Sequence, residues 1–187
     1  MLFLTRIFEE FWDFGHDLFL DTPETFPAAL IAGDVFDPSM IASRTPFYTP
    51  DLPLLTAHGP PELRSLTTLT PLQGRVSAIF SSAFFHLFDE AKQLRIARQL
   101  ASLLSPLPGS VIFGAHVTML VNGMRKAPSL GHDVFCHSPE SWTELWDGIV
   151  FEKGTVSVEM GVKLVDRGPC IGIDDKVVWM SWSVTRI

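Results

Sequence analysis

The chain has little cysteine, few basic residues and no long apolar run. Its two cysteines, Cys136 and Cys170, stand far apart, and no second ligand pair accompanies His132, Cys136 and His137, so neither a disulfide framework nor a metal site is predicted. The chain contains 14 Lys and Arg and 21 Asp and Glu, so its net charge is −7, and it has no run of cationic residues. This charge argues against a nucleic-acid partner. The first apolar run breaks at Arg6, too early for a signal core or membrane span. We therefore expect a cytoplasmic protein with reduced thiols.

What the chain does contain is apolar and aromatic surface. Hydrophobic residues make up 47% of the 187 residues, with 15 Phe and 5 Trp against a single Tyr. That length and composition are typical of one folded domain, which we assign to residues 1–187. The aromatic surplus exceeds what such a domain usually buries, so part of it is expected to face a partner.

The amino-terminal part shows one clear periodic segment. Apolar residues at spacings of three and four, with carboxylates between them, predict an amphipathic helix over residues 8–19. Residues 2–5 suit either a strand or a first helical turn, and residues 27–32 suit a short buried strand. Prolines favour irregular structure over residues 38–61, and leucines three apart suggest a short helix within 62–72.

The middle of the chain has the order strand, helix, strand. Residues 75–80 form a predicted strand, and the periodicity of residues 84–104 predicts a long helix that ends at a Pro-rich turn. The unbroken apolar residues 111–117 predict a strand buried on both faces of a parallel sheet. Together these segments predict one right-handed crossover unit.

The carboxyl-terminal part predicts a loop, a helix and two strands. Residues 118–136 show little pattern and suit a substrate-side loop or lid. Ser138 can cap a helix with Pro139 at its first position. Residues 155–165 and 176–187 alternate in side-chain character and predict an antiparallel pair.

Four motifs in this order carry a family resemblance. They are Ala32-Gly33-Asp34-Val35-Phe36-Asp37, residues 81–88 (Ser-Ser-Ala-Phe-Phe-His-Leu-Phe), residues 106–114 and residues 138–146. From about Phe8 to its end the chain resembles the fungal class I S-adenosylmethionine-dependent methyltransferases of terpenoid, meroterpenoid and polyketide metabolism. The resemblance implies an α/β, partial Rossmann-like sheet with a parallel core and a closing antiparallel pair, in the family order 3-2-1-4-5-7-6. It also implies S-adenosylmethionine as cofactor and a small lipophilic metabolite as substrate.

The first implied site is the adenine end of the cofactor. By resemblance, Asp34 accepts a hydrogen bond from the adenine amino group, and Val35 and Phe36 flank the ring. A carboxylate gives such an amine a charge-assisted hydrogen bond, and apolar neighbours exclude water. The alternative is that Asp34 only caps the turn that ends its strand.

The second implied site lies where the next strand ends. By resemblance, Ser81 and Ser82 face the methyl donor, at the edge of the sheet where doubly wound folds bind ligands. His86 is then either a general base for a hydroxyl acceptor or a residue that orients the substrate. The alternative is that His86 only begins a helix and bonds to the backbone.

The chain also departs from the family pattern. It lacks the first strand and the glycine-rich turn, and the acidic position that holds the ribose falls at Thr5 or Arg6. At the next strand, Ser77 replaces an acidic residue and Phe80 a polar one. We therefore expect an N-terminally truncated domain whose strand edge at residues 76–80 is exposed and open to homo-oligomerisation. The alternative to a methyltransferase is an inactive, methyltransferase-like binding or scaffold protein.

Overall fold

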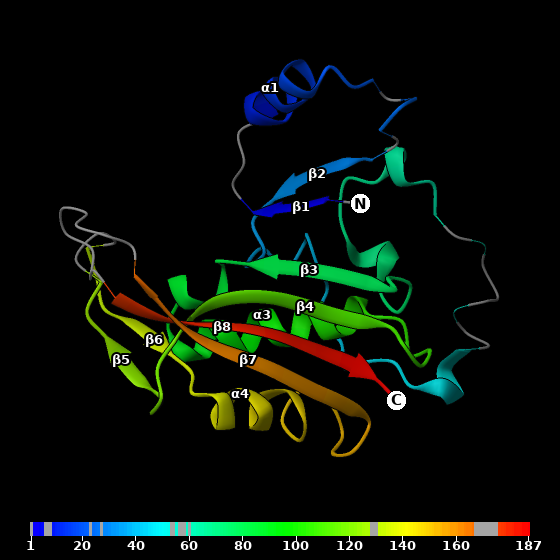
Figure 1. Ribbon diagram of the computed structural model, residues 1–187. Helices are drawn as coiled ribbons and strands as arrows, with labels where there is room; N and C mark the ends of the chain where they lie inside the picture. Colours follow the sequence, from blue (N-terminus) through cyan, green and yellow to red (C-terminus); the bar gives the residue numbers. More distant parts are fainter. Residues whose placement is uncertain are drawn as a thin grey trace.

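The protein is a mixed α/β molecule in which helices cover one face of a sheet (Figure 1). The computed structural model describes residues 2–5, 9–22, 24–26, 28–52, 55, 59, 61–127, 131–166 and 176–187, without the side chains of 2–5, 9–11, 166 and 176. Within those ranges no helix is both long and apolar enough to cross a bilayer. The strands are β1 (Leu2–Thr5), β2 (Leu30–Gly33), β3 (Ala78–Ser82), β4 (Val111–Thr118), β5 (Gly123–Arg125), β6 (Val134–Cys136), β7 (Val156–Asp166) and β8 (Lys176–Arg186). The α-helices are α1 (Glu9–Phe19), α3 (Glu90–Leu103) and α4 (Pro139–Trp146).

The main sheet has the strand order β3-β4-β8-β7. β3 and β4 are parallel, with Ile79 opposite Ile112, whereas β8 runs antiparallel to both β4 and β7. β1 and β2 form a separate parallel pair, and β5 and β6 a small antiparallel hairpin. The parallel core with a closing antiparallel pair confirms the expected partial Rossmann-like arrangement and settles residues 2–5 as a strand.

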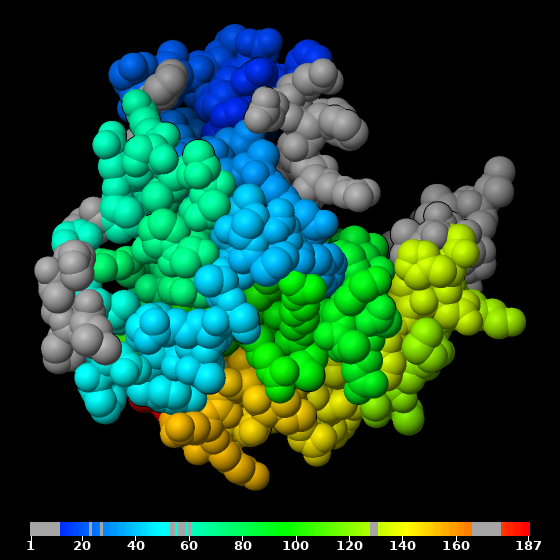
Figure 2. Space-filling view, turned by 180° about the vertical axis from the view of Figure 1, so that it is seen from behind, coloured from blue at the N-terminus to red at the C-terminus, as the bar shows by residue number. Residues whose placement is uncertain are grey.

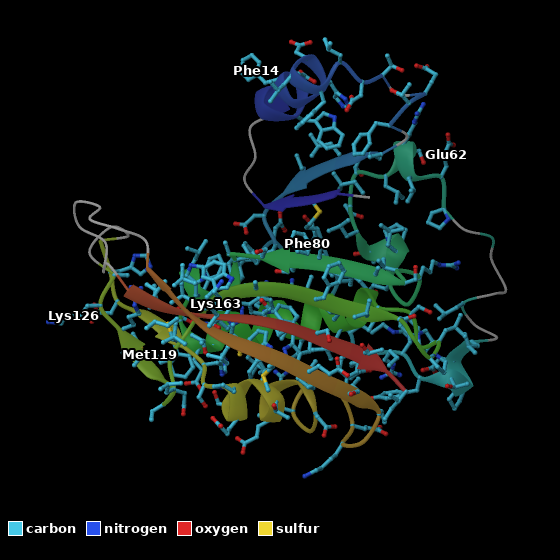
Figure 3. The ribbon with its side chains drawn as sticks, viewed as in Figure 1. Phe14, Glu62, Phe80, Met119, Lys126 and Lys163 are labelled. Carbon is cyan, nitrogen blue, oxygen red and sulfur yellow. The ribbon has the colours of Figure 1, made fainter. Side chains whose placement is uncertain are left out.

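One edge of β3 is open in the described part of the chain. There β3 pairs with β4 alone, and β1, which lies between β2 and β3, makes no ladder with it (Figure 1). Phe80, labelled on β3 in Figure 3, exposes 63% of its surface and meets Phe113 of β4 at a ring distance of 5.3 Å. The expected exposed edge at residues 76–80 is therefore present.

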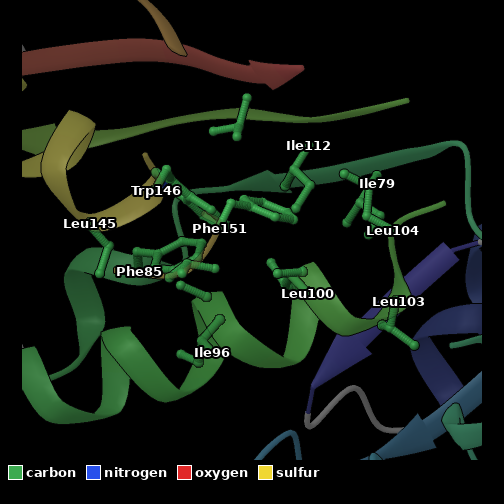
Figure 4. Close-up of a cluster of buried hydrophobic side chains, with 14 of the residues drawn as sticks. Ile79, Phe85, Ile96, Leu100, Leu103, Leu104, Ile112, Leu145, Trp146 and Phe151 are labelled. Atoms are coloured by element: carbon green, nitrogen blue, oxygen red, sulfur yellow. The ribbon is translucent and has the colours of Figure 1, made fainter. Parts of the chain in front are cut away.

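The core lies between the main sheet and helices α3 and α4. Ile96 and Leu100 of α3 lie across from Ile79 and Ile112 of the sheet (Figure 4). Removing such side chains from water is the largest stabilising contribution to a fold of this size, at roughly 25 cal/mol per Å². The position of α3 on this face is consequently set by its apolar stripe.

Rings from three elements fill the other half of the core. Trp142 and Trp146 of α4 are fully buried and lie 5.0 and 6.1 Å from Trp182 of β8, centroid to centroid. Phe85 inserts edge-on against Trp142 at 5.0 Å. Edge-to-face aromatic pairs are favoured over face-to-face ones, so this cluster fixes the orientation of α4 against the sheet.

The expectation that residues 111–117 are buried on both faces is wrong in part. Ile112, His116 and Val117 are buried, but Phe113 is 40% exposed. The reason is that, among the described elements, α3 and α4 cover the same face of the sheet. A continuous apolar run cannot tell a two-sided burial from a one-sided burial of this kind.

Three boundaries also differ from expectation. The helix expected over residues 84–104 begins only at Glu90, because Asp89 caps it by accepting from Lys92 N at 2.8 Å, and a 3₁₀ turn, Phe85–Leu87, precedes it. Residues 62–72 hold two 3₁₀ turns instead of a helix. The expected loop 118–136 contains the β5–β6 hairpin.

The other elements agree with the sequence. The helix over 8–19 is present as α1, and the expected strands at 27–32, 155–165 and 176–187 are β2, β7 and β8. Ser138 caps α4 with Pro139 at its first position, and Gly148 follows its end with a φ of 132°. Where they are described, residues 38–61 are irregular apart from the 3₁₀ turn Thr49–Asp51 and the helical residues Leu52 and Leu55.

Gly114 of β4 provides a test of the β3–β4 pairing. A Cβ at this position would lie 1.8 Å from the Ser81 carbonyl oxygen of the neighbouring strand, a backbone atom that cannot move aside. We expect Gly114→Ala to lower the free energy of unfolding by about 3 kcal/mol or more. Urea unfolding followed by tryptophan fluorescence measures this change.

Gly161 of β7 offers the matched control, because a Cβ there meets nothing within 4 Å. Gly161→Ala should change the free energy of unfolding by no more than about 0.5 kcal/mol. Equal effects of the two substitutions would contradict the close approach of β3 to β4.

Candidate functional site

The candidate site lies where the parallel strands end. β1, β2 and β3 point in the same direction in Figure 1, and Thr5 at the end of β1 is in register with Gly33 at the end of β2. Ligands of doubly wound folds bind at this edge of the sheet. The residues that follow β2 and β3 are therefore the first candidates for ligand contact.

Residues 34–36 leave β2 in a tight turn. Asp34 is exposed, and its Oδ1 accepts a hydrogen bond from Phe36 N at 2.9 Å. Val35 is buried in the core, whereas Phe36 is half-buried. The turn-capping alternative for Asp34 is thus present in the structure, and it uses one carboxylate oxygen while the side chain stays accessible.

Helix α3 holds this turn in place. Gln99 Nε2 donates to the Val35 carbonyl at 2.7 Å, and Arg95 donates to the Phe36 carbonyl from above the Phe36 ring, 5.5 Å from its centroid. Two successive carbonyls after β2 thereby receive side-chain donors in place of a sheet ladder. The bond to Val35 is buried, and buried backbone oxygens are nearly always paired, so Gln99 satisfies a structural need. The bond from Arg95 lies at the surface.

The end of β3 has an unusual backbone. Ala83 has a φ of 53°, a left-handed conformation that a residue with a Cβ rarely adopts, and its N–H donates to the Ala115 carbonyl at 2.7 Å. Ser82 Oγ donates to the same carbonyl at 3.2 Å, while Ser81 is half-buried. Strained residues of this kind gather at functional sites, which marks this turn as part of the candidate site.

The turn at Ala83 places His86 in the short 3₁₀ helix Phe85–Leu87. The half-buried His86 ring lies 6.4 Å from His116 and 6.2 Å from Trp179, centroid to centroid. His86 is therefore on an aromatic wall at the end of β3 and not within the α-helix that was expected there.

The two motifs from the sequence meet through their phenylalanines. Phe36, which follows β2, lies edge-to-face on Phe88 with ring centroids 5.1 Å apart, and Phe88 in turn contacts Phe84 at 5.2 Å. The segments that follow β2 and β3 thus share one contact surface, formed by Phe36, Phe84 and Phe88, even though β2 and β3 lie in different sheets.

Two buried histidines lie behind this surface in a neutral form. Trp182 Nε1 donates to His116 Nδ1 at 3.0 Å, and since an indole N–H can only donate, Nδ1 must be the unprotonated nitrogen. Burial, together with the charges of His86 and His137, lowers the pKa of His116 to about 3. Burial also lowers the pKa of His137 to about 4. Both imidazoles therefore act as uncharged core groups near neutral pH.

Metal ligands do not gather in the described part of the chain. No group of three or more His, Cys, Asp or Glu side chains there could hold an ion. His137 is instead within hydrogen-bond distance of Ser141, 2.9 Å from Nδ1 to Oγ, and burial raises the pKa of the Cys136 thiol. Cys170, like Arg6, lies outside the described residues.

Several residues that shape the site were missed from the sequence. Ala83 carries no sequence signal, because nothing in its neighbourhood marks a left-handed turn. Arg95 and Gln99 lie within the helix predicted over residues 84–104, which assigned them no role, yet they bind the carbonyls after β2. The one sequence feature that could have indicated this role is their spacing: Arg95 and Gln99 are four residues apart and therefore lie on the same side of the helix, beside its apolar stripe.

Comparison with curated proteins finds fungal methyltransferases. The chain is 28% identical over 154 residues to O-methyltransferase phiE of a fungal species, covering 82% of this chain and 42% of that protein. It is 25% identical over 176 residues to methyltransferase ausD of Penicillium brasilianum, covering 92% and 54%. It is 38% identical over 88 residues to the Asnovolin E/Chermesin D methyltransferase nvfJ of Aspergillus novofumigatus, covering 46% and 31%. The resemblance to fungal methyltransferases is thereby confirmed, and the chain spans about half the length of the relatives it matches, or less.

Comparison with family models finds no match. Among solved structures, the DhpI–SAH complex aligns with a TM-score of 0.32 and 16% identity, covering 59% of this chain and 46% of that chain. A zinc-dependent alcohol dehydrogenase of Rhodobacter sphaeroides aligns with a TM-score of 0.39 and 11% identity, covering 62% and 60%. Scores this low contribute nothing to the assignment, which rests on the sequence relatives.

The buried histidines predict a pH dependence of stability. In the unfolded chain a histidine binds its proton near pH 6.5, but His116 and His137 in the fold resist protonation until about pH 3 and about pH 4. The free energy of unfolding therefore has its full value above pH 6.5. It decreases as the pH falls below 6.5, by up to about 1.4 kcal/mol per pH unit for each histidine. Urea unfolding between pH 7 and pH 5 measures the slope, and His116→Gln should reduce it.

The exposed His132 is the control for this experiment. His132→Gln should leave the slope of stability against pH as it is in the parent protein. A slope that His116→Gln does not reduce would contradict the burial of a neutral imidazole at this position.

Proposed function

We propose that this chain, a homologue of fungal methyltransferases, serves in the transfer of a methyl group from S-adenosylmethionine to a small lipophilic acceptor. The proposal rests on one observation above all: the segments that follow β2 and β3 meet at the Phe36–Phe88 contact, at the edge where the parallel strands end. The names of the relatives, O-methyltransferase among them, support the reaction class.

Asp34 and Phe36 form the adenine side of this proposal. Asp34 is exposed and commits Oδ1 to the turn, which leaves Oδ2 for an exocyclic amine. Phe36 is held edge-on by Phe88 and by Arg95, so that an apolar side chain stands beside the carboxylate. Val35 is buried beneath them and supports the turn from within the core. These residues fit the adenine end of the cofactor.

Ser81 and Ser82 lie on the methyl-donor side of this proposal, and His86 lies on the acceptor side. When bound, the cofactor supplies an electrophilic methyl group on a sulfonium. An imidazole can accept a proton from an acceptor hydroxyl near neutral pH, and His86 is half-buried beside Trp179 and Phe85, in surroundings that suit a lipophilic molecule. Ser82 Oγ is engaged with the Ala115 carbonyl, which fixes the turn from which His86 projects.

The adenine contact can be tested by binding alone. Isothermal titration calorimetry with S-adenosylmethionine is expected to show saturable binding to the whole chain. Asp34→Asn keeps the side-chain oxygen for the turn but removes the charge, and should weaken binding about tenfold, since a charge-assisted hydrogen bond is roughly twice as strong as a neutral one.

Asp37 provides a matched control in the same loop, because its carboxylate is exposed and, among the described residues, accepts hydrogen bonds from Ser39 alone. Asp37→Asn should leave the affinity for S-adenosylmethionine unchanged. If the parent chain gives no heat at millimolar donor, the methyltransferase proposal fails for this chain, and the binding or scaffold alternative takes its place.

A further inference from the structure

A cavity opens between helix α3 and the segment that follows β2. Its volume is about 460 Å³, within the usual range for small-molecule sites. Figure 2 shows this face, where the blue-to-cyan segment after residue 35 lies against the green helices. The cavity takes one wall from residues 38–44 and the other from the stripe of α3 formed by Leu94, Arg95, Arg98 and Gln99.

The cavity concentrates positive charge in an acidic protein. Arg44, Arg95 and Arg98 all line it, although the chain carries a net charge of −7. Within the residues that the structure describes, no ion pair joins these three guanidinium groups to a carboxylate. Positive charge gathered in a concave site raises the local concentration of anions.

Two of the three arginines are held in position by aromatic rings. The guanidinium carbon of Arg44 lies 3.9 Å from the centroid of the Phe47 ring, and that of Arg95 lies 5.5 Å from the centroid of Phe36. Arg95 also donates to the Phe36 carbonyl. Groups that are already ordered lose less entropy on binding, so these side chains are pre-organised for an anion.

Gln99 is the uncharged amide among the residues that line the cavity. Gln99 is 7% exposed, and its Nε2 donates a hydrogen bond to the Val35 carbonyl. Its Oε1 is buried and has no hydrogen-bond partner among the described residues. A buried amide oxygen of this kind calls for a donor, which the hydroxyl of a bound molecule would supply.

We infer that this cavity binds a small amphipathic hydroxy acid. Its carboxylate lies at the three arginines, its hydroxyl donates to Gln99 Oε1, and its hydrocarbon part lies against Ile41 and Leu94. A guanidinium fork matches the two oxygens of a carboxylate. The site goes beyond the proposed methyl transfer, because the proposed donor and acceptor contacts are made by Asp34, Phe36 and His86, whereas Arg95 and Gln99 only hold the turn after β2.

The ligand class is tested with four probes, each titrated into the whole chain by calorimetry. 3-Hydroxyoctanoate is expected to bind saturably, octanoate more weakly, and 1-octanol and inorganic phosphate each at least about tenfold more weakly. Equal binding of 1-octanol would overturn the role of the arginines. Equal binding of phosphate would overturn the role of the apolar wall, and equal binding of octanoate that of Gln99.

The location of the site is tested with one variant and one control. Arg98→Gln should weaken the binding of 3-hydroxyoctanoate about tenfold, since it removes a charge-assisted contact. Lys163→Gln, at an exposed position of β7 far along the chain and labelled in Figure 3, should leave it unchanged. Thermal unfolding of both variants verifies that the fold is retained.

The same two variants separate this inference from the proposed function. Arg98→Gln is expected to bind S-adenosylmethionine as the parent chain does, because Arg98 is not at the strand ends. If Arg98→Gln and the parent bind 3-hydroxyoctanoate equally well, the inferred site is wrong whatever the result with the methyl donor. If only the methyl donor fails to bind, the inferred site still stands.

Discussion

The candidate site depends on how helix α3 joins two sheets that share no ladder in the described structure. β2 ends in one sheet and β3 in another, so backbone hydrogen bonds between strands cannot set the distance between the segments that follow them. Gln99 and Arg95 of α3 supply the donors that the carbonyls of Val35 and Phe36 would otherwise lack. Each such bond contributes only about 1 kcal/mol to stability, but leaving a buried carbonyl unpaired costs more. The need to satisfy the buried Val35 carbonyl holds the turn against the helix, and Arg95 adds a second bond at the surface.

The same helix gives the molecule two different surfaces. Its apolar residues, such as Ile96 and Leu100, fill the core below the sheet, while the neighbouring stripe with Arg95 and Gln99 faces the segment after β2. At one end of the junction between α3 and the segment after β2, Phe36 contacts Phe88 and completes the candidate site. Along the same junction, Arg44, Arg95, Arg98 and Gln99 line the cavity between α3 and residues 38–44. The Oε1 atom of Gln99 is buried there. Arg95 and Gln99, which hold the turn after β2, also line this cavity and make it polar.

Much of the fold could be predicted, because its elements follow local rules. The period of α1, the Ser138 cap of α4 and the alternation of β7 and β8 all depend on residues near one another in the chain, and all are present. The extent of α3 could not be predicted in the same way. Periodicity continued from residue 84, but the Asp89 cap and the left-handed Ala83 interrupt it. The exposure of Phe113 on one face of β4, and the β5–β6 hairpin, depend on contacts between distant segments.

The sequence by itself determined the resemblance to fungal methyltransferases, the two motifs and most of the helices and strands along the chain. The reason is that strand ends, turns and helix periods depend on neighbouring residues. It also placed Asp34, Ser81, Ser82 and His86 where strands end. Only the tertiary structure decided that the motifs meet through Phe36 and Phe88, and that Val35 lies in the core. It alone brought three arginines to one cavity. The physical reason is that burial and hydrogen-bond satisfaction are properties of surfaces that close only when distant segments pack together.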